Sequence, residues 1–208
     1  MARARILMAD DHLMLLDAFR ALLEPEFEIV GTATDGRMLL TEFSRLNPDV
    51  VLLDVAMPLL NGLDAGRQLK AQRRSVKLIY LTMNPNPDVA AAALRLGASG
   101  YLLKSSAGRE LKQAIHEALR DRSYITPVVA GDAVGSLIEH RTGHTELTVR
   151  QREVLQLLAE GRSMKEAAAI LDLTPRTVAF HKYRMMEQLR LKTSAELVQF
   201  AVREGIVA

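Results

Sequence analysis

Four short apolar runs in the first half of the chain each end in polar residues, and this placement constrains the fold more than any other feature. The polar residues at these ends are Asp10, Asp11, Asp54, Thr82 and Lys104. Short, continuous apolar runs are typical of parallel strands that are covered on both faces. The carboxyl ends of such strands lie along one edge of a sheet, where open α/β folds build their sites. We therefore expect the carboxylates, the hydroxyl and the ammonium group to share a small volume.

Strand and helix patterns alternate through residues 4–121. The expected strands span 4–10, 28–34, 49–54, 76–82 and 99–103, and the expected helices span 12–23, 36–46, 61–72, 87–96 and 107–121. Strict alternation predicts an α/β fold with a parallel sheet and right-handed crossovers.

The rest of the chain predicts a linker followed by a small all-α domain, so that the chain divides into 1–121, 122–146 and 147–208. The linker contains one proline and three glycines, with weak periodicity, and we expect a short helix near 132–139. The last part predicts four short helices, with N-caps expected at Thr148, Ser163, Thr174 and Ser194. Two helices joined by a short turn form a helix-turn-helix motif.

The composition narrows the class of protein. With 49% hydrophobic and 25% charged residues, it is that of an ordinary globular chain. The absence of cysteine excludes disulfides and thiolate metal sites and fits a reducing compartment. No apolar stretch approaches the length of a membrane span, and the N-terminus lacks a signal-peptide pattern. We therefore expect a cytoplasmic protein with no membrane contact.

Positive charge gathers in the predicted helical domain. Residues 162–192 carry seven basic and three acidic side chains. A local basic excess indicates a polyanionic partner such as nucleic acid. A solvated helix face explains most charge runs, so the charge alone does not assign this partner.

The residues at the strand ends suit phosphoryl chemistry. A carboxylate such as Asp54 can attack a phosphoryl donor and form an acyl phosphate. Mg²⁺ favours one or two carboxylates with phosphate oxygens and water, and Asp10 and Asp11 can hold it. Lys104 offers a charge to the phosphoryl oxygens, and Thr82 offers a hydroxyl donor. Each residue alone is explained as a loop, cap or strand residue, and only their joint placement indicates a site.

The stretches around these residues share a pattern with a known family. They are Met8-Ala9-Asp10-Asp11-His12, Leu53-Asp54-Val55-Ala56-Met57-Pro58, Leu81-Thr82-Met83 and Tyr101-Leu102-Leu103-Lys104. Together they resemble the receiver domain of two-component response regulators, over about residues 4–121. The resemblance implies a flavodoxin-like, doubly wound sheet with strand order 2-1-3-4-5.

The resemblance also implies roles for the acidic residues. Asp54 would accept a phosphoryl group from the histidine of a sensor kinase. Asp11 and Asp54 would bind Mg²⁺ (or Mn²⁺) directly, together with the carbonyl of Ala56. Asp10 would bind the ion mainly through water.

Three further residues would sense the phosphoryl group in a protein of this family. Lys104 would contact it, and Thr82 and Tyr101 would be the coupled switch residues. Met83 follows the switch threonine, where many receivers carry a small residue. This departure predicts narrower access to the phosphoryl group.

The helical module carries its own family pattern. The stretches are Leu147-Thr148-Val149-Arg150-Gln151-Arg152-Glu153-Val154-Leu155, Ala159-Glu160-Gly161, Lys165-Glu166-Ala167-Ala168, and Thr177-Val178 with His181. They resemble the helix-turn-helix effector of the NarL/FixJ (LuxR-type) regulators. The resemblance spans the whole module. It implies a recognition helix from Thr174 to Leu189 that enters the major groove of DNA.

The candidate DNA contacts lie on this helix and the one before it: Lys165, Thr174, Arg176, Thr177, Phe180, Lys182, Tyr183 and Arg184. Arginine and lysine reach phosphates and guanine edges, and threonine does either. Phe180 belongs either to the core or to a contact with a thymine methyl. Ala179 stands where the family often has lysine, which removes one expected contact.

These expectations converge on a response regulator in which phosphorylation of Asp54 controls DNA binding, with a homodimer on paired half-sites.

The second hypothesis is that the protein is an enzyme. Haloacid-dehalogenase phosphatases need a second aspartate two residues after the nucleophile, and here that residue is Ala56. No P-loop motif is present either. We therefore expect no enzymatic activity beyond phosphotransfer and autodephosphorylation on Asp54. A DNA binder or adaptor that is independent of phosphorylation is the third reading.

Overall fold

The computed structural model describes residues 3–139 and 147–207. The chain forms two compact units, Met1–Thr142 and Gly143–Ala208. Each unit is described by itself. Among the described residues, none of the helices combines the length and the hydrophobicity that a membrane span requires.

The first unit is built on a six-stranded parallel sheet. Its strands are β1 (Arg5–Ala9), β2 (Glu28–Ala33), β3 (Val50–Asp54), β4 (Lys77–Thr82), β5 (Gly100–Leu103) and β6 (Tyr124–Ile125). They lie in the order β2-β1-β3-β4-β5-β6, and every neighbouring pair is parallel. The predicted doubly wound fold is confirmed, with a sixth strand added at one edge.

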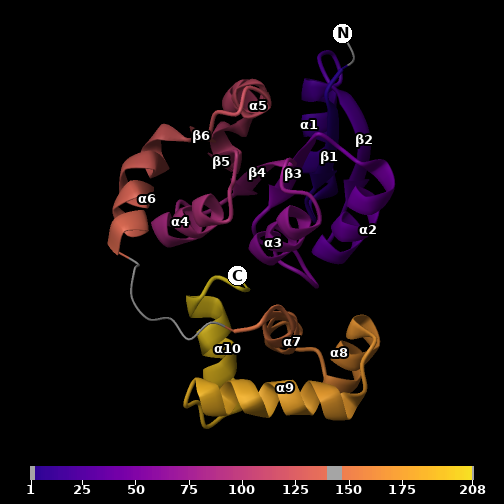
Figure 1. The fold of residues 1–208 in the computed structure, drawn as a ribbon, viewed down its shortest axis with the longest axis vertical. Helices are drawn as coiled ribbons and strands as arrows, with labels where there is room; N and C mark the ends of the chain where they lie inside the picture. Colours follow the sequence, from indigo (N-terminus) through magenta and orange to yellow (C-terminus); the bar gives the residue numbers. More distant parts are fainter. Residues whose placement is uncertain (1–2, 140–146, 208) are drawn as a thin grey trace. The chain divides into compact units, whose positions relative to one another are not determined.

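Helices cover both faces of this sheet (Figure 1). They are α1 (Leu13–Leu23), α2 (Gly36–Leu46), α3 (Gly62–Gln72), α4 (Pro87–Arg95) and α5 (Lys104–Leu119). Side chains of β3 alternate between two apolar clusters. Val51 and Leu53 pack in the cluster that includes residues of α2, α3 and α4. Val50 and Leu52 pack in the cluster with α1 and α5. Burial on both faces explains why the strand sequences are continuously apolar.

The segment that follows α5 corrects the sequence analysis. β6 pairs with β5, and α6 (Pro127–Glu139) packs against α4. Val129 and Ala133 of α6 are buried in the same cluster as Ala90 and Ala93 of α4. Residues 124–139 therefore belong to the first unit rather than to the predicted linker 122–146, and the short helix expected near 132–139 is the second part of α6. The remainder, 140–146, lies outside the described residues.

The second unit is a small helical domain, as predicted. Its helices are α7 (Val149–Ala159), α8 (Met164–Leu171), α9 (Pro175–Gln188) and α10 (Ser194–Arg203). Capping boxes begin α7 and α8, and Thr174 caps α9 by accepting a hydrogen bond from the Thr177 amide. One side of α9 faces the core of this unit, where Val178 and Met185 are buried.

Two helix starts differ from the sequence analysis. α5 begins at Lys104, directly after β5, and not at residue 107. The N-cap of α10 is Thr193, whose side chain accepts from the Glu196 amide, and not Ser194.

Candidate functional site

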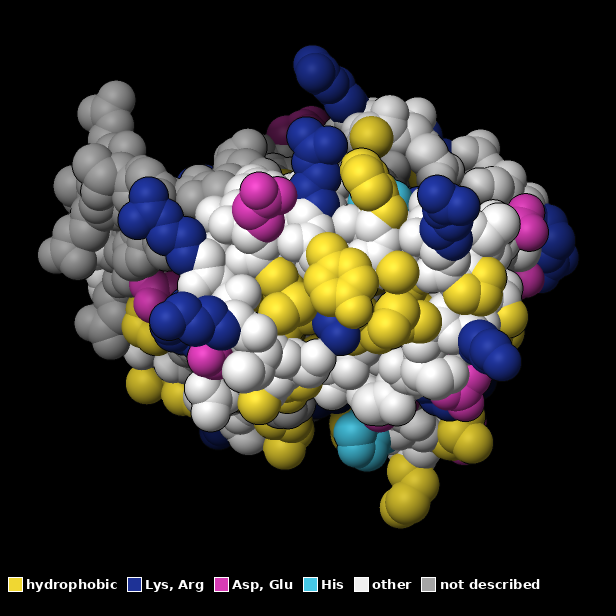
Figure 2. Space-filling model, turned by 90° about the horizontal axis from the view of Figure 1, so that it is seen from below, with side chains coloured by type: hydrophobic (Ala, Val, Ile, Leu, Met, Phe, Trp, Pro, Cys, Tyr) yellow, Lys and Arg dark blue, Asp and Glu magenta, His cyan; other side chains and the backbone are white. Residues whose placement is uncertain are grey.

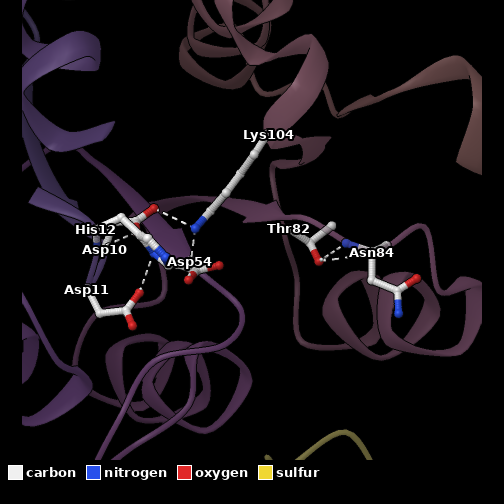
Figure 3. A network of polar contacts seen from close by, with 7 residues as sticks. All are labelled: Asp10, Asp11, His12, Asp54, Thr82, Asn84 and Lys104. Atoms are coloured by element: carbon white, nitrogen blue, oxygen red, sulfur yellow. Dashed lines mark hydrogen bonds and ion pairs between the residues drawn. The ribbon is translucent and has the colours of Figure 1, made fainter. Parts of the chain in front are cut away.

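The predicted polar residues meet at the carboxyl edge of the sheet (Figure 3). Asp10 follows β1, Asp54 ends β3, Thr82 ends β4, and Lys104 begins α5 directly after β5. The fold holds the end of β3 tightly, because a Cβ atom at Gly62 would lie 2.1 Å from the Asp54 carbonyl oxygen. Only glycine fits this close approach of the start of α3 to the strand.

Lys104 lies between two buried carboxylates. Its Nζ atom is 2.7 Å from Asp10 Oδ2 and 3.0 Å from Asp54 Oδ2. The three side chains are at most 4% exposed. A buried charge is costly unless it is paired, so the lysine neutralises part of an acidic pocket.

The burial of this pocket changes its acid–base behaviour. Burial raises the pKa of Asp54 above the ordinary aspartate value, while Lys104 acts in the opposite direction and the Asp10 charge adds to the rise. A backbone hydrogen bond from Ala56 also favours the charged form of Asp54. Burial lowers the pKa of Lys104, but the contacts with Asp10 and Asp54 outweigh it, so the pKa is raised overall.

Asp11 and His12 complete the cluster. His12 Nδ1 lies 2.8 Å from Asp11 Oδ1 and 3.2 Å from Asp10 Oδ1. One potential ligand atom from each of Asp10, Asp11, His12 and Asp54 lies within 4.8 Å of the others. Oxygen donors gathered in this way suit a hard divalent cation such as Mg²⁺. The acidic cluster thus fits the predicted metal.

Thr82 is tied to the loop that follows β4. Its hydroxyl donates to the Asn84 carbonyl oxygen and accepts from the Asn84 amide, both at 3.2 Å. Figure 3 shows Thr82 next to Asn84, and among the described residues the Thr82 hydroxyl bonds to the Asn84 backbone and not to Asp54. Tyr101 is fully buried, and its hydroxyl has no hydrogen-bond partner among the described residues. Burial raises the pKa of Tyr101 to about 12, and the nearby Thr82 hydroxyl acts in the opposite direction, although the two side chains do not complete a hydrogen bond.

Sequence reasoning missed two residues of this site. His12 directly follows the acidic pair in the sequence. Its side chain contacts both carboxylates, and this side-chain conformation cannot be predicted from the spacing of the residues. The backbone amide and carbonyl of Asn84 bind the Thr82 hydroxyl. Because this contact does not depend on the side chain at position 84, the sequence does not predict it.

The second candidate site is the outer face of α9. Five of the predicted residues on this helix or at its N-cap are exposed: Thr174, Arg176, Phe180, Tyr183 and Arg184. Lys165 is exposed on α8. Thr177 is half-buried, and its hydroxyl lies 2.9 Å from that of Thr174.

Lys182 departs from this face. It is half-buried, and its Nζ atom donates to Ser194 Oγ of α10 at 2.8 Å. The same nitrogen lies 5.6 Å from the centre of the Tyr183 ring. The structure therefore directs the Lys182 ammonium toward α10, at the flank of the exposed face and beside Tyr183.

Comparison with protein families accounts for both units. A model described as the response regulator receiver domain matches residues 6–116. A second, described as bacterial regulatory proteins of the luxR family, matches residues 145–201. Among curated proteins, the nitrate/nitrite response regulator protein NarL of Escherichia coli K12 is 32% identical over 209 residues. The match covers 98% of this chain and 97% of NarL.

Solved structures of RcsB are also similar. RcsB from Salmonella enterica serovar Typhimurium, bound to the promoter rprA in the presence of the phosphomimetic BeF3⁻, is 27% identical with a TM-score of 0.62. The match covers 95% of this chain and 98% of that one. A structure of two RcsB dimers bound to two parallel DNAs is 26% identical with a TM-score of 0.60, over 96% of this chain and 98% of that one. With a receiver-type sheet, an acidic pocket at its edge and a helix-turn-helix unit, the chain belongs to the NarL/FixJ family of response regulators.

Proposed function

We propose that phosphoryl transfer to Asp54 in the first unit controls DNA binding by residues 147–208, and thereby transcription. The observation that carries this proposal is the buried pairing of Lys104 with both Asp10 and Asp54 at the carboxyl edge of the sheet. A carboxylate held beside a fixed cation is suited to receive an anionic group.

In the proposed reaction, an Asp54 carboxylate oxygen attacks the phosphorus of a phosphohistidine on a sensor kinase. The phosphorus–nitrogen bond breaks as the phosphorus–oxygen bond forms, and its electron pair stays on the nitrogen, so that the histidine leaves as neutral imidazole with the proton already on its other ring nitrogen. Lys104 turns from Asp54 to the phosphoryl oxygens, because its chain is long enough to follow the charge. Asp10, Asp11, Asp54 and the Ala56 carbonyl would hold Mg²⁺ or Mn²⁺. That ion, when bound, would offset the negative charge on the phosphoryl oxygens.

Thr82 and Tyr101 form the proposed switch. The Thr82 hydroxyl exchanges its contacts with Asn84 for a phosphoryl oxygen. Its departure removes the Thr82 side chain from beside the Tyr101 hydroxyl, which completes no hydrogen bond among the described residues. A buried polar group without a partner is unfavourable, so Tyr101 is poised to adopt a second position. Such a two-state element is what a local charge change can bias.

The proposed output is DNA binding through the exposed face of α9, with Lys165 contributing from α8. Base and phosphate contacts come from Thr174, Arg176, Thr177, Phe180, Tyr183 and Arg184, with Lys182 limited to the flank of the helix. The structures of RcsB on DNA, one of them with RcsB dimers, support DNA binding by a homodimer, and we propose that the dimer occupies paired half-sites. We propose a cytoplasmic location, because DNA and a sensor kinase are the proposed partners. The only chemistry we assign is phosphotransfer and autodephosphorylation on Asp54.

The test combines an acyl-phosphate donor and Mg²⁺ with DNA selected by the purified protein. We expect one phosphoryl group on the full chain by intact mass and a tighter dissociation constant for the selected DNA. Asp54→Ala should lose both effects. Asp17→Ala, which removes an exposed carboxylate from α1, should keep them. Equal DNA affinity with and without the donor, at full phosphorylation, would contradict the proposed control.

A further inference from the structure

Two aromatic side chains stand on the outer face of α9. Phe180 is 56% exposed and Tyr183 is 60% exposed, although aromatic residues usually bury much of their surface. The apolar core of this helix is supplied by Val178 and Met185, which are fully buried. Phe180 therefore does not belong to the core, and its ring needs another explanation.

The surroundings of the two rings are positively charged. The Arg184 guanidinium lies 5.8 Å from the centre of the Phe180 ring, and Lys182 lies beside Tyr183. Figure 2, which views the molecule from below, shows hydrophobic side chains gathered together with lysine and arginine side chains around them. Within 174–189, three basic residues face one acidic residue. This charge favours a polyanion over a second apolar protein surface.

The major groove of DNA offers one apolar group, the 5-methyl of thymine, and phenylalanine is among the side chains that contact it. Phe180 lies in the N-terminal half of α9, the part that a recognition helix directs at base edges. Ala179 beside it is short, so no long side chain competes with the ring.

We propose that Phe180 selects a thymine in each DNA half-site through contact with its 5-methyl group. This inference rests on the proposed DNA-binding function and adds a base preference to it. Arg184, which lies against the ring, supplies charge to the same contact and holds the ring in place. The methyl contact sets the base choice, and the guanidinium sets the affinity and its dependence on salt.

The experiment replaces each thymine of the selected DNA, one at a time, by deoxyuridine, which lacks only the methyl group. Binding of the phosphorylated full chain is measured by fluorescence anisotropy. We expect one position in each half-site where deoxyuridine weakens binding roughly fourfold, the effect of burying about one fewer methyl group. Phe180→Ala should bind the thymine and deoxyuridine DNAs equally, and Phe180→Leu should still distinguish them.

Two further variants separate methyl recognition from other losses. Arg184→Ala should bind more weakly and with a lower salt dependence, yet keep the preference for thymine. Val202→Ala removes an exposed apolar side chain on α10 and should change neither property.

Two outcomes overturn this inference but not the proposed function. One is sequence-selective binding whose affinity is unchanged by every deoxyuridine substitution, and the other is a preference for thymine that survives in Phe180→Ala. If Phe180→Ala instead weakens self-association and leaves the thymine preference intact, the ring serves a protein interface. Failure to enrich any DNA overturns the proposed function as well.

Discussion

At the scale of single residues, the acidic pocket gives stability a dependence on pH. The pKa of Asp54 is raised in the folded state, chiefly by burial. Over the pH range between the ordinary aspartate value and this raised value, the folded chain binds the proton more tightly than the unfolded chain. The contribution of Asp54 to the free energy of unfolding therefore falls as pH rises through the raised pKa.

Asp54→Asn isolates this contribution. We expect the variant to be more stable than the parent at neutral pH without metal, because it removes a buried charge. The difference in the free energy of unfolding should shrink as pH falls below the raised pKa. Urea unfolding of both proteins with a chelator across acidic to neutral pH measures it. A difference that does not vary with pH would mean that Asp54 titrates alike in both states.

The pocket also marks the limit of sequence reasoning at this scale. Asp10, Asp54 and Lys104 were predictable as neighbours, because each comes at the carboxyl end of a buried strand. The contacts of His12 and Asn84 were not, because they depend on a side-chain rotamer and on a turn of the backbone. The exposed position of Phe180 was likewise left open, since an aromatic residue on a helix suits a core as well as a surface.

At the scale of helices and strands, local capping decides where helices begin. Ser163 Oγ accepts from the Glu166 amide at 3.2 Å, and the Glu166 carboxylate accepts from the Ser163 amide at 2.8 Å. We expect Ser163→Ala to destabilise the helical domain by about 1 kcal/mol. Ser163→Asp, which keeps a capping oxygen, should cost much less. Thermal unfolding of the full chain and faster hydrogen exchange at the Glu166 amide measure the effect, and unchanged exchange in Ser163→Ala would contradict it.

Capping also explains which boundaries the sequence analysis located. Thr148, Ser163 and Thr174 have the side-chain bonds expected of N-caps. At α5 the N-cap is Leu103, whose side chain makes no capping hydrogen bond. The start of that helix therefore could not be predicted from the residue type at the N-cap. At α10 the predicted N-cap, Ser194, was wrong by one residue, because the adjacent Thr193 has the extended backbone and the side-chain bond of an N-cap.

At the scale of the whole molecule, α6 belongs to the unit that precedes it. Its burial of Val129 and Ala133 against α4 predicts that a fragment 1–139 is more stable than a fragment 1–122, by about 3 kcal/mol for the lost apolar burial. Urea unfolding followed by circular dichroism measures the difference. Equal midpoints for the two fragments would show that α6 contributes nothing to the receiver.

The two units themselves were predictable, since alternating strands and helices give way to four capped helices. The true extent of the first unit was not. Pro127 and Gly131 favoured a linker before the short helix expected near 132–139, because glycine inside a helix is unfavourable and proline often marks a break. Only contact with α4 reveals that Val129 and Ala133, one helical turn apart, form a buried face.

A rule for building hybrid regulators follows from this helix. Fusing the DNA-binding domain of one relative to the receiver domain of another requires a choice of fusion junction. A junction at residue 122 would place a helix from the other protein against α4, and the two surfaces would not be complementary. A junction after Glu139 keeps α4 and α6 from the same protein, and the new DNA-binding domain is then joined through the residues that follow.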